Sequence, residues 1–208
     1  QTLKVTGDGY APSGEFYGDS ADPIGWVEEA KLDTPVPQTV MERPVKPEDV
    51  TGLPCLLLVC AVCNDAALQK EKGEWAIVGD PTEGALLTLA AKGDVDPLVW
   101  SQALPRVAEV PFSSERKRMT VVVSTQNEAF TALLQNRPQD SHNDLTTHPF
   151  LLSMKGAPEL VLNCCGQSLS PTGKVQQTLT QEDRDRILAQ NNTMAQEGLR
   201  VLGLAYRP

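Results

Sequence analysis

The run from Phe150 to Glu159 constrains this chain most, because it predicts where a strand gives way to a helix. The first five residues are mostly apolar and predict a strand, after which Lys155 and Gly156 follow. Pro158 stands where a first helical residue is expected, since its fixed φ suits that position and its missing N–H is not needed there. A single cation therefore lies beside a bare glycine and next to a helix N-terminus, whose free N–H groups favour anions.

Two interpretations of this stretch remain open. Lys155 can form the corner of a site for a phosphorylated small molecule, since Gly156 has no side chain to keep a ligand from the backbone. Alternatively, Lys155 is a solvated charge at the edge of a sheet, which is the more common role of such a lysine. Taken alone, the stretch favours the solvated charge, so the other motifs must decide.

Composition excludes several classes of protein. The 208 residues suffice for one large domain or two small ones, and the formal net charge is −9. That charge argues against a nucleic-acid-binding protein but not against binding of an anionic nucleotide by a local cluster of cations. The longest apolar run, Leu53 to Val62, is too short for a membrane span of roughly 20 residues. No signal peptide follows Gln1, and we expect a processed or excised piece of a longer protein.

The cysteines favour a reduced protein interior. Their number is odd and most lie within apolar runs, as expected of core thiols in a cytosolic setting. Cys60 and Cys63 have the spacing of half a zinc site or of a redox motif, but no second pair stands at metal-ligand spacing. We therefore expect a structural role for them and no metal site. The five cysteines are Cys55, Cys60, Cys63, Cys164 and Cys165.

Periodicity predicts the elements of the first half of the chain. Two short strands flank a Gly/Pro turn between Leu3 and Tyr17, and residues 19–49 are a long surface connection rich in proline and acidic residues. A core helix follows over Pro54 to Leu68. Asp80-Pro81-Thr82-Glu83 has the form of a capping box, in which Glu83 reaches back to the N–H of Asp80. The remaining predicted elements are a strand at Trp75–Val78, a helix from Pro81 to Lys92 stopped by Gly93, and a helix from Pro97 through Leu104.

The second half predicts strands in antiparallel pairs. Two strands, Arg106–Phe112 and Met119–Thr125, are joined by a charged segment, and the polar insertion 126–149 leads the chain back into Phe150. A helix from Pro158 to Cys165, a longer helix from Thr180 to about Gly198 and a final strand, Arg200–Tyr206, complete the chain. We expect a single α+β domain over residues 1–208, with a mostly antiparallel twisted sheet flanked by helices.

The common nucleotide-binding and catalytic motifs are absent. The chain has no Gly-x-x-x-x-Gly-Lys-Ser/Thr loop, no Gly-x-Gly-x-x-Gly after a strand, and no Ser/His/Asp or Cys/His signature. Four dispersed segments remain as candidates, in the order Gly79–Leu86, Pro111–Met119, Met154–Glu159 and Gly198–Leu202.

These four segments resemble the nucleotide-binding domain of P-type cation-transporting ATPases, from about Leu53 to the end of the chain. Lys155-Gly156-Ala157-Pro158-Glu159 is the most specific piece, followed by Gly-Asp-Pro-Thr-Glu-Gly at 79–84 and by the Phe-Ser-x-x-x-Lys segment at 112–117. The family's phosphorylation motif, Asp-Lys-Thr-Gly-Thr, precedes this domain and is absent here. The resemblance therefore implies a monomeric cytoplasmic domain excised from a membrane pump of the branch that contains the Ca²⁺ and Na⁺/K⁺ pumps, and within that branch we favour a Ca²⁺-ATPase.

The resemblance also implies an adenine pocket. Phe112 would stack on the base, Glu83 would accept a hydrogen bond from the adenine amino group, and Lys155 would line the pocket. Gly156 and Ala157 would let the base approach the backbone. From the residues alone, Phe112 can instead be a core side chain at a strand end, and Glu83 can be the capping-box partner of Asp80.

Three further residues are implied near the phosphates. Lys117 and Arg200 would supply positive charge, while Arg116 and Arg118 are expected to be solvated. Ser114 stands where some members of the family place an arginine, so one phosphate contact is missing or is replaced by a hydroxyl.

The mechanism implied by the resemblance is delivery of ATP. The γ-phosphate would project to an aspartate on the phosphorylation domain of the same pump, with Mg²⁺ held mainly by domains outside this chain and with the actuator domain as a further partner. Weak ATP binding and little hydrolysis are then expected of the chain alone. The alternative is a non-catalytic acidic module that binds a partner protein. A self-contained enzyme would need a nucleophile or a metal-carboxylate cluster, and the sequence suggests neither.

Overall fold

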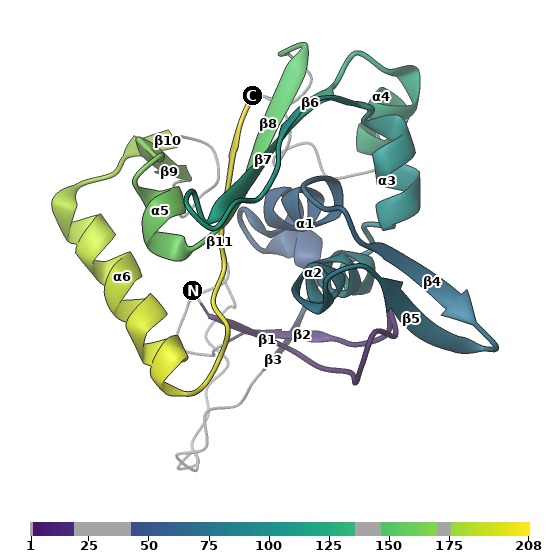
Figure 1. The fold of residues 1–208 in the computed structure, drawn as a ribbon, viewed down its shortest axis with the longest axis horizontal. Coiled ribbons are helices and arrows are strands. Elements are labelled where there is room, and N and C mark those ends of the chain that lie inside the picture. The colour runs from purple at the N-terminus through teal and green to yellow at the C-terminus, as the bar shows by residue number, and fades with distance from the viewer. Residues whose placement is uncertain (1, 19–42, 136–146, 170–175) are drawn as a thin grey trace, which may run out of the picture.

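The computed structural model describes residues 2–18, 43–135, 147–169 and 176–208. A four-stranded antiparallel sheet forms its centre, in the order β11, β8, β7, β6 (Figure 1). The register pairs Lys155 with Met119, and Gly156 with both Arg118 and Gly203. The predicted α+β class with a mostly antiparallel sheet is confirmed. The strands of this sheet are β6 Arg106–Val110, β7 Arg118–Ser124, β8 Phe150–Gly156 and β11 Gly203–Arg207.

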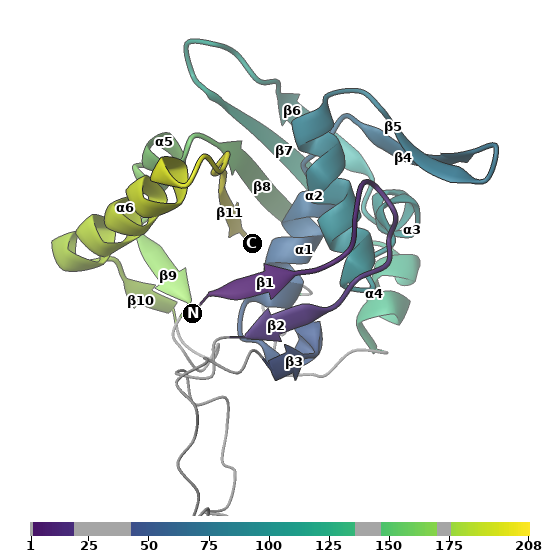
Figure 2. The same ribbon diagram turned by 90° about the horizontal axis from the view of Figure 1, so that it is seen from below.

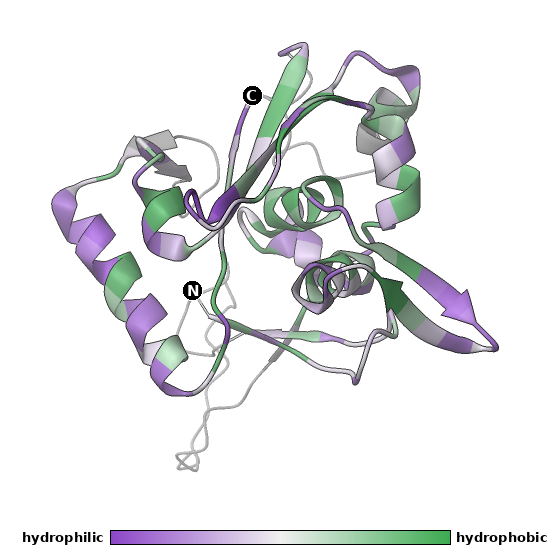
Figure 3. Ribbon diagram, in the orientation of Figure 1, coloured by the Kyte–Doolittle hydropathy of each residue, from purple (hydrophilic) through white to green (hydrophobic). Residues whose placement is uncertain are grey.

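Helix α1, Leu53–Val62, occupies the core against one face of this sheet. Every residue of α1 except Leu56 is buried, as expected of a helix that is apolar on all sides. It shares one hydrophobic cluster with Met119, Val121 and Val123, the alternate residues of β7. Helices α2, Pro81–Lys92, and α3, Pro97–Ala103, pack against α1. The apolar centre stands out in the hydropathy colouring (Figure 3).

The remaining elements surround this core. Both ribbon views place α5 and α6 on the side of the sheet away from α2 and α3, and α6 has no buried residue (Figures 1 and 2). A small antiparallel sheet, β1-β2-β3, lies below α1 and α2 in Figure 1, where the β4–β5 hairpin projects to the right. No described helix has the length and apolar character of a membrane span. The bounds are β1 Leu3–Val5, β2 Phe16–Gly18, β3 Arg43–Val45, β4 Ala67–Glu71, β5 Glu74–Val78, α5 Pro158–Leu162, β9 Gln167–Leu169, β10 Gln176–Thr178 and α6 Gln181–Gln196.

Most predicted elements are confirmed, but the predicted end of the first core helix is wrong. The helix expected to run to Leu68 stops at Val62, and the Asn64 side chain then donates to the Cys60 carbonyl at 3.2 Å and accepts from the Ala66 N–H at 3.0 Å. These bonds turn the chain into β4, which pairs with β5 through the Lys72-Gly73 turn. The helical spacing of Leu68 concealed this hairpin. Strands β9 and β10 were also not predicted.

Two predicted irregular stretches contain regular structure. The polar insertion 126–149 begins with α4, Glu128–Gln135, whose Phe130 is fully buried against Trp100 of α3. The surface connection 19–49 ends in β3, which pairs with β2, and in the 3₁₀ turn Pro47–Asp49. Residues 19–42 and 136–146 lie outside the described part of the chain. The final strand begins at Gly203, so Arg200 precedes it.

Phe130→Ala should lower the free energy of unfolding by about 3–5 kcal/mol, because it removes a fully buried ring and leaves a cavity beside Trp100. Urea denaturation measures the change. Phe112→Ala is the matched control, since the Phe112 ring is 61% exposed and its loss should change stability by no more than about 0.5 kcal/mol. Equal effects of the two substitutions would show that α4 does not contribute to the core.

Candidate functional site

A buried ion pair links the central sheet to helix α2. Lys155 points from the end of β8 toward α2, and its Nζ donates to Glu83 Oε1 at 2.7 Å. The side chains are only 8% and 18% exposed, respectively. The other carboxylate oxygen of Glu83 accepts from the Asp65 N–H at 3.0 Å. Lys155 is therefore not the solvated edge charge that the isolated motif favoured.

The first turn of α2 holds Glu83 in this orientation. Asp80 caps the helix, because its carboxylate accepts from the N–H groups of Thr82 at 2.8 Å and Glu83 at 3.2 Å. The pKa of Asp80 lies below its ordinary value, first because of the Thr82 hydroxyl and then because of these two N–H groups. The capping role of Asp80 is confirmed, but the Glu83 carboxylate faces Lys155 and Asp65 rather than the Asp80 N–H. The Asn64 side chain also donates to the Glu83 carbonyl at 3.0 Å.

Arg200 reaches the same turn of α2 from the other end of the sequence. Its Nη1 donates to Thr82 Oγ1 at 2.8 Å, and its charge contributes to the lowered pKa of Asp80. The segment that precedes β11 thus places the exposed guanidinium of Arg200 beside Thr82, the neighbour of Glu83 in the chain. Thr82 was not singled out from the sequence as a site residue, although it lies within the Gly79–Leu86 segment.

The loop between β6 and β7 presents an exposed ring and exposed polar groups. Phe112 is 61% exposed, so the interpretation of this residue as a core phenylalanine is wrong. Ser114 and Lys117 are exposed on the same loop. Lys117 has a left-handed backbone, with φ of 48°, and its N–H donates to the Ser113 carbonyl at 2.7 Å. This conformation is uncommon for a residue with a side chain, so its neighbours must hold the loop in place.

Gly156 and Ala157 fix the end of that loop. A Cβ on Gly156 would lie 2.4 Å from the Lys117 carbonyl oxygen, and the Ala157 N–H donates to the same oxygen at 3.0 Å. The space left by the missing side chain of Gly156 is therefore filled by the backbone of the loop. This contact explains why position 156 needs a glycine without reference to a ligand. From the sequence we instead expected the glycine to let a base approach the backbone.

One end of the central sheet thus gathers the residues singled out from the sequence. Pairing of β7 with β8 places the loop that bears Phe112, Ser114 and Lys117 at the end of the sheet where Lys155 lies. Glu83 reaches the same end from α2, and Arg200 is bonded to the first turn of α2. An exposed aromatic ring, a buried carboxylate-ammonium pair and two further cations can together recognise an anionic ligand with an aromatic part.

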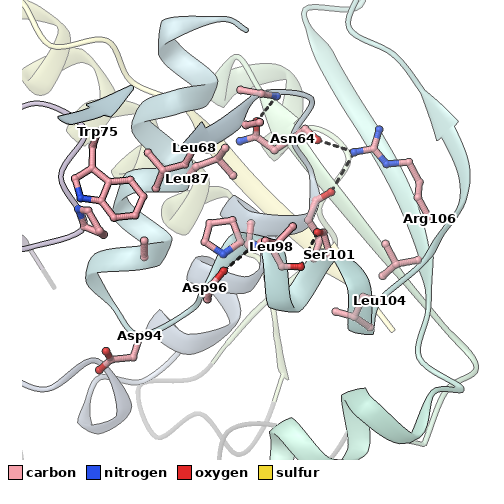
Figure 4. Close-up of a pocket in the computed structure, with 18 residues that line it drawn as sticks. Asn64, Leu68, Trp75, Leu87, Asp94, Asp96, Leu98, Ser101, Leu104 and Arg106 are labelled. Carbon is pink, nitrogen blue, oxygen red and sulfur yellow. Dashed lines mark hydrogen bonds between the residues drawn. The ribbon is translucent and has the colours of Figure 1, made fainter. Parts of the chain in front are cut away.

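A cleft with a volume of about 740 Å³ lies away from these candidate site residues. It opens between the β4–β5 hairpin, α2 and α3, and is lined at opposite ends by Trp75 and Arg106 (Figure 4). Arg106 is fully engaged there, since it donates to Asp65 and Glu109 at 2.7 Å each. Burial lowers the pKa of Arg106, but these two carboxylates outweigh it and raise the pKa overall. None of the site residues lines this cleft, so we do not assign the nucleotide to it.

The predicted core thiols are confirmed. Cys55, Cys60 and Cys63 are buried, and burial is the main cause that raises the pKa of Cys60 to about 12 and of Cys63 to about 11. Thiols that do not ionise near neutral pH are poor metal ligands and poor nucleophiles. Within the described ranges, no group of three or more His, Cys, Asp or Glu residues could hold a metal ion.

Comparison with known proteins supplies independent evidence. Residues 53–208 match the family model described as "P-type ATPase, cytoplasmic domain N". The chain is 37% identical over 161 residues to the "Probable cation-transporting ATPase F" of Mycobacterium tuberculosis, covering 77% of this chain and 15% of that protein. It is 28% identical over 208 residues to a "Calcium-transporting ATPase" of Bacillus subtilis, covering 100% of this chain and 18% of that protein. A "Sodium/potassium exporting P-type ATPase cta3" of Schizosaccharomyces pombe is 35% identical over 153 residues, covering 73% of this chain and 12% of that protein.

Glu83→Gln should destabilise the domain by about 3–5 kcal/mol, because it leaves the buried Lys155 ammonium without its counter-charge. Lys155→Met should have a similar effect by isolating the carboxylate. The double variant should lose much less than the sum of the two single effects, since both charges are then gone. Urea denaturation of all four proteins measures the coupling, and additive losses would contradict a buried pair.

Gly156→Ala should cost about 1–3 kcal/mol of stability, because its Cβ would overlap the Lys117 carbonyl and displace the loop. Amide NMR shifts from Phe112 to Lys117 should change with it. Gly166→Ala is the matched control, since a Cβ there meets nothing within 4 Å. A Gly156→Ala protein with the stability and loop shifts of the control would remove the role that we assign to Gly156.

Proposed function

The chain belongs to the P-type ATPases, as a cytoplasmic domain N, and from that premise we propose that it binds ATP by its adenine and presents the γ-phosphate to an aspartate on another domain. One observation carries the proposal. The buried Glu83–Lys155 pair lies at the same end of the sheet as the exposed ring of Phe112. No other described part of the chain joins an exposed aromatic ring to a buried carboxylate and ammonium.

Phe112, Glu83 and Lys155 recognise the base in this proposal. Stacking on an aromatic side chain is worth about 1–3 kcal/mol per base, and a ring that is 61% exposed is open to such stacking. Glu83 accepts a hydrogen bond from the adenine amino group, while the bond from Lys155 holds the carboxylate in its orientation. Gly156 and Ala157 contact the Lys117 carbonyl and so hold the loop that carries Phe112. In this proposal the two residues also lie beside the edge of the base.

Lys117, Ser114 and Arg200 face the phosphates. Arg200 is already tied to Thr82 at the N-terminus of α2, so its guanidinium is partly oriented before the ligand arrives. Ser114 supplies a hydroxyl rather than a charge. In this proposal Mg²⁺ arrives with the nucleotide and is held mainly by other domains.

The chain supplies one part of a larger reaction cycle. Transfer of the γ-phosphate forms an aspartyl-phosphate on the phosphorylation domain, a covalent intermediate that divides the reaction into two easier steps. The described residues orient ATP and carry no nucleophile for this transfer. We therefore expect the chain alone to bind ATP weakly and to hydrolyse little of it, with the phosphorylation and actuator domains as its partners in the intact, membrane-embedded pump.

Ca²⁺ is the cation that we propose for the intact pump. The segments at 79–84 and 112–117 resemble those of both the Ca²⁺ and the Na⁺/K⁺ pumps, and one relative is named as a calcium-transporting ATPase. Another relative is named as a sodium/potassium exporter. Ion transport by membranes that contain the parent protein, measured with each cation in turn, would separate the two.

Phe112→Ala should weaken ATP binding by about tenfold or more, because it removes the stacking platform and leaves the ion pair in place. Amide NMR shifts during an ATP titration give the Kd and should cluster near Glu83, Phe112, Lys155 and Arg200. Phe150→Ala is the control, since this ring is also half exposed but lies at the far end of β8. No shifts at millimolar ATP would favour the acidic partner-binding module instead.

A further inference from the structure

Two adjacent cysteines, Cys164 and Cys165, follow the short helix α5 and lie outside both the proposed ATP site and the hydrophobic core. Neither takes part in the function proposed above. Their backbone continues the helical turn, since the N–H groups of Cys164 and Cys165 donate to the carbonyls of Val161 and Leu162 at 2.9 Å and 3.0 Å. We call these two residues the vicinal thiol pair.

Arg184 of α6 fixes the backbone of this pair. Its two guanidinium nitrogens donate to the Leu162 carbonyl at 2.8 Å and to the Cys165 carbonyl at 2.6 Å. The turn therefore does not depend on the thiols themselves, and either sulfur can change its partner without loss of the fold. Burial raises the pKa of the Cys165 thiol, and the Arg184 guanidinium only partly opposes that rise.

Both sulfurs are at least partly accessible to solvent, and both make similar weak bonds. Cys164 is exposed and Cys165 half-buried, whereas the other three cysteines are buried. Each sulfur makes only a weak bond to the carbonyl four residues earlier, Cys164 to Leu160 at 3.4 Å and Cys165 to Val161 at 3.3 Å. Both sulfurs would have to leave these bonds to share a ligand, and the bond of the exposed Cys164 is the easier one to break.

The raised pKa of Cys165 favours a protonated thiol, so a ligand must displace the proton to bind this sulfur. Burial raises the pKa of Cys165, and the neighbouring Cys164 raises it further, because two adjacent thiolates repel each other. An ion that accepts both thiolates removes that repulsion. Within the described ranges no third His, Cys, Asp or Glu completes a metal cluster, so a closed tetrahedral zinc site is not available.

We propose that the vicinal thiol pair is a binding site for soft, thiophilic ions that need only two protein ligands, such as monovalent copper or a trivalent arsenical. Thiolates select soft ions over the hard cations that oxygen ligands prefer. The proposal is independent of ATP binding, since it uses none of the residues assigned to the nucleotide.

Phenylarsine oxide is the sharpest probe, because it reacts with two thiols at once. Two S–H bonds break, two As–S bonds form on the same arsenic, and the arsenic-bound oxygen leaves as water. Arsenic stays trivalent and no oxidant is needed. The product is a cyclic dithioarsinite, which a dithiol competitor displaces far more readily than a monothiol does.

The test is mass spectrometry of the intact, folded 208-residue protein after reaction with phenylarsine oxide and a monothiol wash. One phenylarsenic group per chain should remain, and it should be lost from Cys164→Ser and from Cys165→Ser. Cys60→Ser is the control, since its buried thiol is out of reach and the adduct should persist. Thermal unfolding of each variant checks that the fold is retained.

Monovalent copper provides a second readout that does not depend on covalent capture. Competition with a chromophoric copper chelator should show one Cu(I) bound per chain, with at least a tenfold loss of affinity in either serine variant at positions 164 and 165. Retention of the arsenical or of copper by folded Cys164→Ser and Cys165→Ser would overturn the proposal. Absence of both ligands from the unmodified protein would overturn it equally.

Discussion

The ion pair between Glu83 and Lys155 organises the site, because it is the contact where the central sheet meets the first turn of α2. Each charge is removed from water, so each depends on the other, and the Asp65 N–H satisfies the remaining carboxylate oxygen. Burial of this kind rarely adds much stability compared with apolar packing, but it fixes orientation. The carboxylate and ammonium are consequently held at the end of the sheet beside the Phe112 loop, where the polar edge of a base can meet them.

The loop that bears Phe112 is positioned by backbone contacts. Lys117 adopts a left-handed conformation because its carbonyl is caught between Ala157 and the bare Gly156. That contact ties the loop bearing Phe112 to the strand bearing Lys155. The large cleft beneath the β4–β5 hairpin contains no such arrangement, and its only arginine is neutralised by two carboxylates. The proposed nucleotide site therefore rests on the convergence of charged and aromatic groups and not on the size of a cavity.

Much of this fold could be predicted from local signals, and the exceptions have physical causes. Asp80, Pro81 and Gly93 marked the bounds of α2, and Thr180 with Asp183 marked the start of α6, because caps act within a few residues. The end of α1 was missed, since Leu68 fits a helical spacing and only the bonds of Asn64 turn the chain into a hairpin. The burial of Phe130 was not predicted, because a single aromatic residue within a polar stretch gives no periodic pattern. The residues of the site were chosen through resemblance, and no local pattern could have revealed the pairing of Glu83 with Lys155, which lie 72 positions apart.

The central claim is that adenine lies between the Phe112 ring and the Glu83–Lys155 pair. Intermolecular NOEs from the H2 and H8 protons of ATP to the side chains of the isotope-labelled domain test it most directly. We expect NOEs to the ring protons of Phe112 and to the methylene protons of Lys155. NOEs confined to residues of the separate cleft, such as Trp75 and Leu98, would contradict it.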